Sequence, residues 1–396
     1  MTESCDVAIV GAGLVGTSLA LALARAGLSV VLIEPRAPAA YSDEWDSRVY
    51  AVSPGSAAFL ADIGAWQGVA SERVARVETM RIFGDQASSR LEFSAYDAGL
   101  GELAFIVEGG RMQQALWQCV ARAPHVRLMC PATCVALSHH AAYAELQLDN
   151  GTNLHANLVV GADGAQSWVR EQAGIKVTAH DYQQCGVVAN FTCALPHQDT
   201  AYQWFRADGV LALLPLPGEH ATAHATARVS MVWSTSETHA QALLALEASE
   251  LAQQVCAASS NTMGALEIIT PAAAFPLKLQ RVEHFVTPRV ALVGDAAHNV
   301  HPLAGQGVNL GFRDARELAA VLCDRGAQHD CGDYALLRRY ERARKEDVLA
   351  MQLATDGLQK LFASQAVWVS RARNFGMRIV ESQPLLKNLL VKHAAA

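Results

Sequence analysis

Three short apolar runs in this chain each lead directly into a turn rich in glycine or containing a Gly-Asp pair. Residues 6–10 (DVAIV), 158–160 (LVV) and 290–293 (VALV) are largely β-branched, which is typical of strands buried on both faces. The first run continues into an Ala- and Leu-rich segment, residues 17–26, which predicts a helix ended by Gly27. A second apolar run at 28–33 completes a predicted strand–helix–strand unit.

The middle of the chain has a different pattern. Its apolar segments are short, partly alternating, and separated by Pro, Gly and Asp, which predicts an antiparallel sheet. These segments are residues 187–194, 202–205, 210–216 and 227–233. Farther along, helical spacing predicts helices over residues 312–323 and 334–362.

The turn after the first strand carries candidate binding chemistry. Gly11 permits a tight turn, Gly13 lets the backbone approach a pyrophosphate, and Gly16 lets the helix pack closely on the strand. The helix N-terminus offers unpaired N–H groups to a diphosphate. Glu34 ends the second strand, where a carboxylate can accept hydrogen bonds from ribose hydroxyls. This context predicts dinucleotide binding but does not choose between NAD and FAD.

Two later turns extend the predicted site. Asp163-Gly164 follows the second apolar run, and Gly294-Asp295 follows the third. Asp295 is placed to accept hydrogen bonds from a chain of hydroxyls, and the backbone of residues 305–311 can lie flat against a planar ring. The following helix directs its positive dipole end toward that ring, which suits a negatively charged reduced flavin.

Composition and charge narrow the class of protein. The 396 residues are 51% hydrophobic and 17% charged, which excludes a disordered chain. A net charge of −7 without a long basic run argues against nucleic-acid binding. Nine irregularly spaced cysteines predict free thiols and no metal site. The sequence lacks the features of a signal peptide or a membrane span, so we expect a cytoplasmic protein.

Together the motifs resemble those of the class A flavoprotein monooxygenases, whose archetype is p-hydroxybenzoate hydroxylase. The resemblance rests on the glycines at 11–16, on Asp163-Gly164, and on residues 294–311 (GDAAHNVHPLAGQGVNLG), and it spans residues 5 to about 345. Within the class, residues 301–311 are most similar to the ubiquinone-biosynthesis hydroxylases. The DSR at 46–48 agrees with this resemblance.

The resemblance implies FAD as the cofactor and assigns residues to it. Arg48 and Arg111 would contact FAD, Asp295 would hold the ribityl hydroxyls, and Asp163 with Gly164 would serve FAD packing and NAD(P)H use. The glycine-rich run would complete the site with Gly305, Gln306, Gly307 and Asn309. The residues alone leave open a surface ion pair for each arginine, a helix cap for Asp295, and a plain turn for Asp163-Gly164.

The catalytic candidates by resemblance are His301 and Pro302, nearest the flavin ring, and His298. Histidine titrates near neutrality, but the position of His298 just after a strand fits a structural hydrogen bond equally well. The antiparallel sheet would cover one flavin face and line a substrate pocket. Candidate pocket residues are Tyr202, Trp204, Phe205, Leu211, Leu213 and Trp233, with ordinary core packing as the alternative.

The predicted fold is α/β (α+β overall), with a Rossmann-like FAD-binding domain interleaved with a substrate-binding β-sheet domain. The FAD-binding domain takes residues 1–75, 100–175 and 276–345, the sheet domain takes 76–99 and 176–275, and C-terminal helices occupy 346–396.

By resemblance, the protein hydroxylates a prenylated phenol in ubiquinone biosynthesis. NAD(P)H, a transient co-substrate, would reduce the flavin, which would add O2 to form a C4a-hydroperoxide. Two alternatives are a hydroxylase of a small soluble aromatic acid and a non-catalytic flavin-binding scaffold in a quinone-biosynthesis assembly.

The C-terminal segment, residues 364–396, is basic and apolar in an acidic protein. Arg371, Arg373, Arg378, Lys387 and Lys392 stand against Glu381. This pattern predicts contact with the surface of the inner membrane or with a ubiquinone-biosynthesis complex. The alternative is a helical cap on the protein's own core or at the interface of a homo-oligomer.

Overall fold

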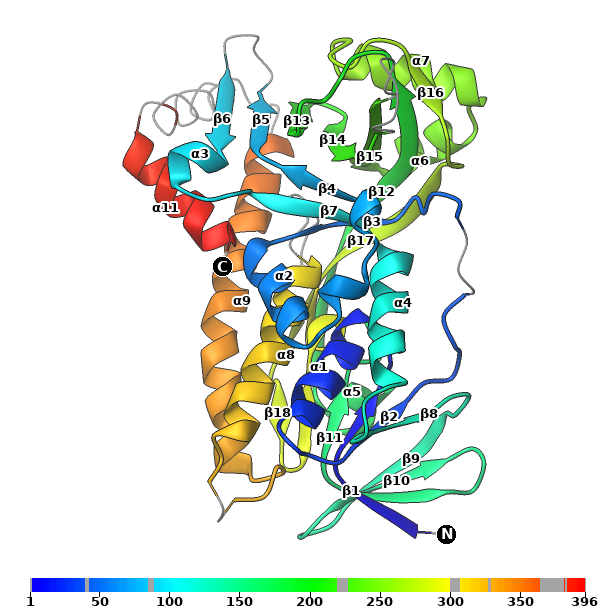
Figure 1. Ribbon diagram of the computed structural model, residues 1–396, viewed down its shortest axis with the longest axis vertical. Helices are drawn as coiled ribbons and strands as arrows, with labels where there is room; N and C mark the ends of the chain where they lie inside the picture. The colour runs from blue at the N-terminus through cyan, green and yellow to red at the C-terminus, as the bar shows by residue number, and fades with distance from the viewer. Residues whose placement is uncertain are drawn as a thin grey trace.

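A computed structural model describes residues 2–39, 43–84, 89–218, 227–299, 307–326, 329–363, 381 and 383–395. Within these ranges the chain forms an eight-stranded sheet in the lower half of Figure 1, a nine-stranded sheet above it, and a three-stranded sheet between them. This mixed architecture confirms the predicted α/β fold class.

The eight-stranded sheet has a parallel centre. Its main path runs through β18 (Val286–Thr287), β19 (Val290–Leu292), β11 (Asn153–Gly161), β1 (Thr2–Val10), β2 (Val30–Ile33) and β8 (Val126–Met129). β10 (Ala144–Leu148) pairs with β11, and β9 (Cys134–His139) pairs with β10. The pairs from β19 through β11, β1 and β2 to β8 are parallel, so their carboxyl ends meet at one edge.

Helices cover this sheet. α1 (Leu14–Arg25) packs against α8 (Gly307–Cys323) and α4 (Gly109–Val120), and α8 packs against α9 (Tyr334–Ala363). Because α1 connects the parallel strands β1 and β2, the predicted strand–helix–strand unit is confirmed. α8 begins five residues before the predicted helix because its glycine-rich start is helical. A Cβ at Gly311 would lie 2.5 Å from Val15 of α1, so glycine is needed for this close packing.

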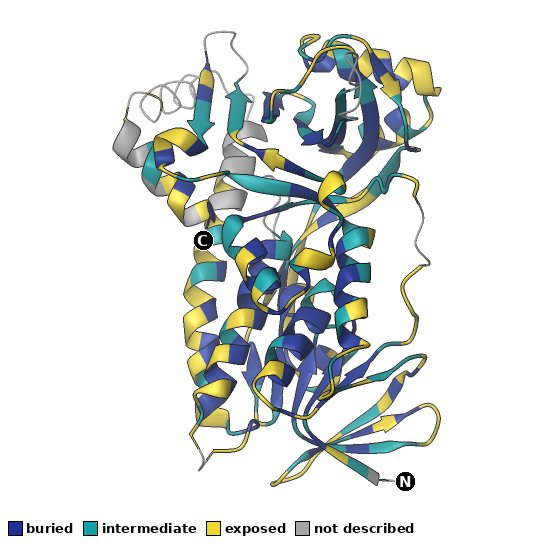
Figure 2. Ribbon diagram, in the orientation of Figure 1, coloured by how far each residue is buried: buried dark blue, intermediate teal, exposed yellow. Residues whose placement is uncertain are grey.

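The nine-stranded sheet is mainly antiparallel, as predicted. Its path runs through β20 (His298–Asn299), β17 (Ala273–Val282), β12 (Val177–Cys193), β15 (Ala227–Ser236), β14 (Gly209–Leu216), β13 (Thr200–Arg206), β5 (Thr79–Phe83) and β6 (Arg90–Ser94), and β16 (Leu266–Ile268) pairs with β12. The β13–β5 pair is parallel. Figure 2 shows that burial is greatest in the central strands of the two large sheets, whereas outer strands such as β5 and β9 are partly exposed.

Different elements cover the two faces of the nine-stranded sheet. One face forms a hydrophobic cluster with α6 (Glu237–Leu244) and α7 (Ala248–Ala258). The other packs on the three-stranded sheet of β3 (Val49–Val52), β7 (Ala104–Glu108) and β4 (Val74–Val77) through Ala201, Leu214 and Leu216. This second face is therefore the one turned toward the lower half.

Short helices complete the described chain. They are α2 (Pro54–Asp62), η1 (Trp66–Gly68), η2 (Ser71–Arg73), α3 (Ala95–Ala98), α5 (Trp168–Gln172), η3 (Gly294–Ala296) and α11 (Pro384–Ala395).

The described part of the C-terminal segment lies against the protein's own surface. α11 contacts α3, and the Glu381 carboxylate accepts a hydrogen bond from the Glu92 backbone N–H at 3.0 Å. Residues 364–380 of the predicted segment lie outside the described ranges. None of the helices in those ranges combines the length and the apolar character needed to cross a bilayer.

Candidate active site

The first glycine-rich turn has the geometry of a diphosphate cradle. Gly11 has φ +102°, and a Cβ there would lie 2.5 Å from the Ala162 carbonyl oxygen. A Cβ at Gly16 would overlap the Gly11 carbonyl oxygen. Gly13, the exposed N-cap of α1, has open space where its Cβ would be, so a ligand can approach its backbone. These glycines leave the α1 N-terminus accessible to an anion.

Side chains hold the Ala12 peptide of this turn from both sides. Its N–H donates to Glu34 Oε2 at 2.8 Å. Its carbonyl accepts from Gln113 Nε2 at 2.7 Å, from Trp117 Nε1 at 2.9 Å and from the Thr17 hydroxyl at 2.9 Å. Sequence reasoning missed Gln113 and Trp117. Their i, i+4 spacing on one helix face was the available signal, but it did not reveal that α4 lies beside α1.

The second turn is joined to the third. Asp163 Oδ2 accepts from the Val169 N–H at the start of α5 at 3.0 Å, while its buried Oδ1 has no hydrogen-bond partner among the described residues. Arg170 of α5 donates to the Ala296 carbonyl at 2.9 Å. Gly164 has φ +83°, which glycine adopts without strain. Asp163 thus anchors a helix that in turn contacts the Gly294-Asp295 turn.

Asp295 lies at the carboxyl end of the parallel strands. Asp295 is exposed, but the surrounding protein displaces enough solvent to raise the pKa of its carboxyl group. The charges of His298 and Arg48 act in the opposite direction. Burial also raises the pKa of Tyr50, with the Asp295 charge adding to the shift. The Asp295 carboxylate, Tyr50 and Arg48 therefore share one electrostatic environment.

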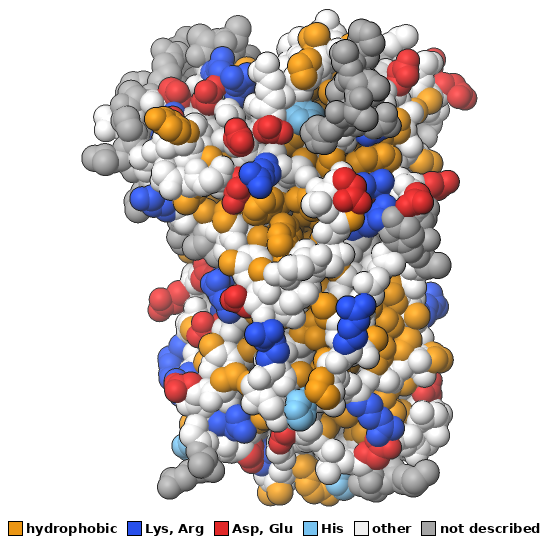
Figure 3. All heavy atoms as spheres, viewed as in Figure 1, with side chains coloured by type: hydrophobic (Ala, Val, Ile, Leu, Met, Phe, Trp, Pro, Cys, Tyr) orange, Lys and Arg blue, Asp and Glu red, His pale blue; other side chains and the backbone are white. Residues whose placement is uncertain are grey.

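Arg48 connects this environment to the upper sheet. The Arg48 guanidinium carbon lies 5.4 Å from the centre of the Tyr50 ring and 5.5 Å from that of the Phe275 ring on β17. Arg48 and Phe275 are both exposed. Figure 3 shows hydrophobic side chains gathered between the upper and lower halves of the molecule.

Arg111 lies at the start of α4, with 11% of its side chain exposed and its guanidinium nitrogens 3.9 Å from the carboxylates of Glu108 and Asp43. It lines a recess of about 300 Å³ together with Gly68, Ala70, Gln114 and Gln118.

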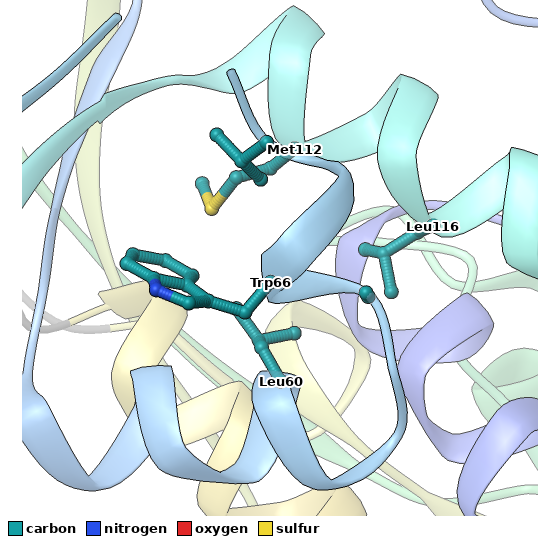
Figure 4. Close-up of a pocket in the computed structure, with 6 residues that line it drawn as sticks. Leu60, Trp66, Met112 and Leu116 are labelled. Carbon is teal, nitrogen blue, oxygen red and sulfur yellow. The ribbon is translucent and has the colours of Figure 1, made fainter. Parts of the chain in front are cut away.

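The opposite face of α4 is apolar. In Figure 4, Met112 and Leu116 approach Leu60 and Trp66, and this packing anchors the helix.

His298 is buried and committed to a polar network. Its Nε2 lies 2.6 Å from Asp314 Oδ2, which also accepts the Gly294 N–H at 2.9 Å. Arg344 donates to Asp314 Oδ1 at 2.7 Å. These contacts support the structural interpretation of His298 that the sequence left open.

Asn309 is also buried. Its Oδ1 accepts the Ser53 N–H at 2.9 Å, and its Nδ2 donates to the Ala51 carbonyl at 2.8 Å. Its side chain therefore ties α8 to β3 and α2. Gly307 is half-buried at the start of α8. The predicted residues His301, Pro302, Gly305 and Gln306 lie outside the described ranges.

The predicted pocket residues lie on the helix-covered face of the upper sheet. Tyr202 pairs with Leu213, Trp204 with Leu211, and Leu211 with Trp233, so all five side chains share one face. Each is at most 6% exposed and belongs to the cluster completed by α6 and α7. This burial agrees with the alternative of ordinary core packing for these five residues, because the residues alone did not reveal which face the helices cover. The side chain of Phe205, the remaining candidate, lies on the opposite face of the sheet from these five.

The face turned toward the lower half is better suited to a ligand. Its central patch comprises Val188, Asn190, Ala212, Leu214, Ser230 and Val232, which cross-strand pairing brings together. None of these six residues is charged, and Ala212, Leu214 and Val232 remain half-buried. The Asn190 amide donates to the Asp46 carbonyl at 2.9 Å, which fixes this face to the segment carrying Arg48.

These features fit FAD. The glycines of the first turn leave room beside a helix N-terminus, and the exposed Asp295 carboxylate supplies an acceptor for hydroxyls.

All nine cysteines are free thiols. Within the described ranges, no group of three or more His, Cys, Asp or Glu side chains is arranged to hold a metal ion.

Comparisons with known proteins agree with this geometry. The family model described as "FAD binding domain" matches residues 4–354. The chain is 36% identical to 3-demethoxyubiquinol 3-hydroxylase of Escherichia coli, over 99% of this chain and 98% of that protein. It is 35% identical to ubiquinone hydroxylase UbiL of Rhodospirillum rubrum, over 98% of this chain and 89% of the relative.

Solved structures share the fold. PqsL of Pseudomonas aeruginosa, in complex with 2-aminobenzoylacetate, matches with a TM-score of 0.79 at 22% identity, over 95% of this chain and 100% of that one. HpxO of Klebsiella pneumoniae, complexed with FAD, matches with a TM-score of 0.74 at 17% identity, over 99% of both chains.

Proposed function

The chain belongs to the FAD-binding monooxygenase family that includes the ubiquinone hydroxylases, and from this premise we propose that it hydroxylates the ring of a prenylated ubiquinone precursor. FAD is the cofactor, and O2 and NAD(P)H are the proposed co-substrates. The two relatives named above support a quinol substrate.

The proposed cofactor roles follow the contacts in the lower half. The α1 N-terminus at Gly13 would receive the diphosphate, and Glu34, which orders that turn, has acceptor capacity left for ribose hydroxyls. Asp295 would accept hydrogen bonds from the ribityl chain. Arg48 and Arg111 would contribute positive charge, with Arg111 near the recess beside α4.

When bound, FAD supplies the redox and oxygen-activating chemistry, and the protein supplies binding, orientation and exclusion of water. The central patch of the upper sheet would form the wall that excludes water and holds an apolar ring. Phe275 and the aliphatic stem of Arg48 would extend that wall toward Asp295. By resemblance, His301 and Pro302 remain the proposed catalytic residues nearest the ring. His298 is proposed to position the turn rather than to react.

One observation carries the substrate proposal: the patch facing the cofactor half contains no charged residue. A soluble aromatic acid would need a cation to compensate its carboxylate, because an unpaired charge is costly to bury, and Arg48, the cation at the edge of this wall, is assigned here to FAD. A neutral phenol with an isoprenoid chain needs an apolar wall. The patch therefore favours the prenylated substrate over the small acid.

The proposal is tested by following NADH and NADPH oxidation by the FAD-loaded protein and identifying the product by mass spectrometry. We expect a short-chain prenylated phenol to stimulate oxidation and to gain one oxygen atom. Stimulation by p-hydroxybenzoate alone would favour the soluble-acid hydroxylase. Bound FAD without stimulated oxidation by any phenol would favour the non-catalytic scaffold.

A lipid-soluble substrate also supports contact with a membrane surface. The described helix α11 carries an exposed Lys392, with Leu390 46% exposed, and the neighbouring α3 carries Tyr96, 90% exposed, whereas Lys387 is paired with the Glu381 carboxylate at 3.2 Å. We propose that α11, as part of the C-terminal segment, contacts together with α3 the bilayer from which the substrate is taken.

A further inference from the structure

The segment carrying Asp295 is held from behind by buried polar side chains of α9. This segment, residues 292–299, runs from the end of β19 through η3 to β20. At its start, the buried Tyr340 hydroxyl donates to the Leu292 carbonyl at 2.9 Å. At its end, the buried Gln352 amide lies 3.5 Å from the Asn299 carbonyl.

The middle of the segment is held through Asp314, which is fully buried on α8. Asp314 Oδ2 accepts the Gly294 N–H and contacts His298, while Oδ1 accepts from Arg344 of α9. One carboxylate thus contacts Gly294, which precedes Asp295, and His298, which follows η3, as well as the neighbouring helix. Burial alone would raise the pKa of Asp314, but His298 and Arg344 outweigh it and hold the pKa below its ordinary value.

Arg344 is itself held in place. Only 5% of the residue is exposed, and a second guanidinium nitrogen donates to Asp347 at 2.6 Å. A buried carboxylate without this cation would be an uncompensated charge, which is strongly destabilising. The direction of the Asp314 carboxylate therefore depends on α9.

We propose that Arg344 and Asp314 are positioning residues for FAD: through them, α9 fixes the turn that presents Asp295 to the cofactor. Neither residue is proposed to touch FAD or substrate. This inference rests on the FAD site of the proposed function and extends it to a helix outside the glycine-rich motifs.

The chemistry of the turn explains why it needs such support. Gly294 has φ +59°, and its N–H points into the protein toward Asp314. An asparagine at 314 has one acceptor oxygen and one amide donor in place of two acceptor oxygens. It cannot bond Gly294, His298 and Arg344 together as the carboxylate does, so the turn would lose its fixed direction while the local volume stayed the same.

The test measures FAD binding by the apoprotein, using quenching of flavin fluorescence at a temperature where every variant is folded. We expect Asp314→Asn to raise the dissociation constant for FAD by about tenfold or more. Arg344→Lys, which keeps the charge but loses the planar fork, should raise it by a smaller factor, and Arg344→Gln by a larger one.

A control separates positioning from general loss of stability. Leu243→Ala removes a buried side chain of α6 from the cluster that this helix forms with the upper sheet. We expect it to lower the melting temperature while leaving the FAD dissociation constant within about twofold of wild type.

FAD affinity within about twofold of wild type in both Asp314→Asn and Arg344→Lys would overturn the inference, as would an equal loss in Leu243→Ala. If Asp314→Asn does not fold, the two Arg344 variants decide. A wild-type protein that binds no FAD would instead refute the proposed function.

Discussion

The backbone N–H of Ala12 donates to the Glu34 carboxylate across 2.8 Å, and this hydrogen bond joins the first glycine-rich turn to the end of β2. Glu34 Oε1 lies 3.2 Å from the Arg36 backbone N–H, which it accepts. A carboxylate has about four acceptor sites, so Glu34 can order the turn and still receive a ribose hydroxyl. The residue is thus both part of the protein's framework and a candidate ligand contact.

Replacement of Glu34 tests both roles. Glu34→Ala removes both backbone bonds and should weaken FAD binding by about tenfold or more, whereas Glu34→Gln keeps one acceptor oxygen for Ala12 and should cost less. Isothermal titration of the apoproteins with FAD measures the difference. Unchanged affinity in Glu34→Ala would contradict this assignment.

Asp295→Ala should reduce FAD retention because the ribityl hydroxyls lose a charge-assisted acceptor. We expect the flavin-to-protein absorbance ratio to fall after gel filtration. Asp62→Ala, at the exposed end of α2, provides the control for removal of one carboxylate. Equal flavin content in wild type and Asp295→Ala would remove Asp295 from the site.

The two faces of β15 can be tested at adjacent positions. Val232→Glu introduces a charge into the uncharged central patch and should lower kcat/KM for a prenylated phenol by about tenfold or more while FAD stays bound. Trp233→Phe alters the helix-covered face and should mainly lower the melting temperature. The reverse pattern would return the substrate pocket to the face first predicted from the sequence.

Acid should weaken the α8–α9 contact. Because the folded protein holds the Asp314 pKa below the value of about 3.9 for an unfolded aspartate, the unfolded chain binds that proton more readily. The stability from Asp314 is complete above that value and is lost as the pH falls through the folded-state pKa. Urea unfolding between about pH 3 and 6 should show a steeper loss in wild type than in Asp314→Asn. Parallel curves would refute the prediction.

The membrane proposal predicts reduced binding to vesicles after polar replacement of exposed apolar side chains. Tyr96→Ser combined with Leu390→Ser should decrease sedimentation with vesicles of phosphatidylglycerol and phosphatidylethanolamine, because less apolar surface enters the interface. Leu195→Ser, which changes a 50% exposed residue in the loop between β12 and β13, is the control. Equal sedimentation of wild type, the double variant and Leu195→Ser would show that α11 only packs against the protein's own surface.

Sequence reasoning succeeded where the signal is local. The glycines at 11, 13 and 16 are confined to one strand–turn–helix unit, and the crowding of Gly16 against the Gly11 carbonyl oxygen arises within that unit. The alternation in residues 202–216 likewise predicted antiparallel strands, which cross-strand pairing confirms. The assignment of Asp295 to the cofactor stays a prediction, although its exposed position agrees with it.

The sequence by itself determined the family, the cofactor class and the antiparallel strands over residues 202–216, because these depend on residue type and short spacing. Only the tertiary structure decided which face of the upper sheet meets the lower half, and which distant side chains hold the cofactor turn. Trp204 and Gln203 are adjacent in the chain, yet their side chains lie on opposite faces of the sheet and have different neighbours. Arg344 and Asp314 lie 30 positions apart and meet because two helices pack together. Such contacts arise from packing over long sequence separations, which no local pattern encodes.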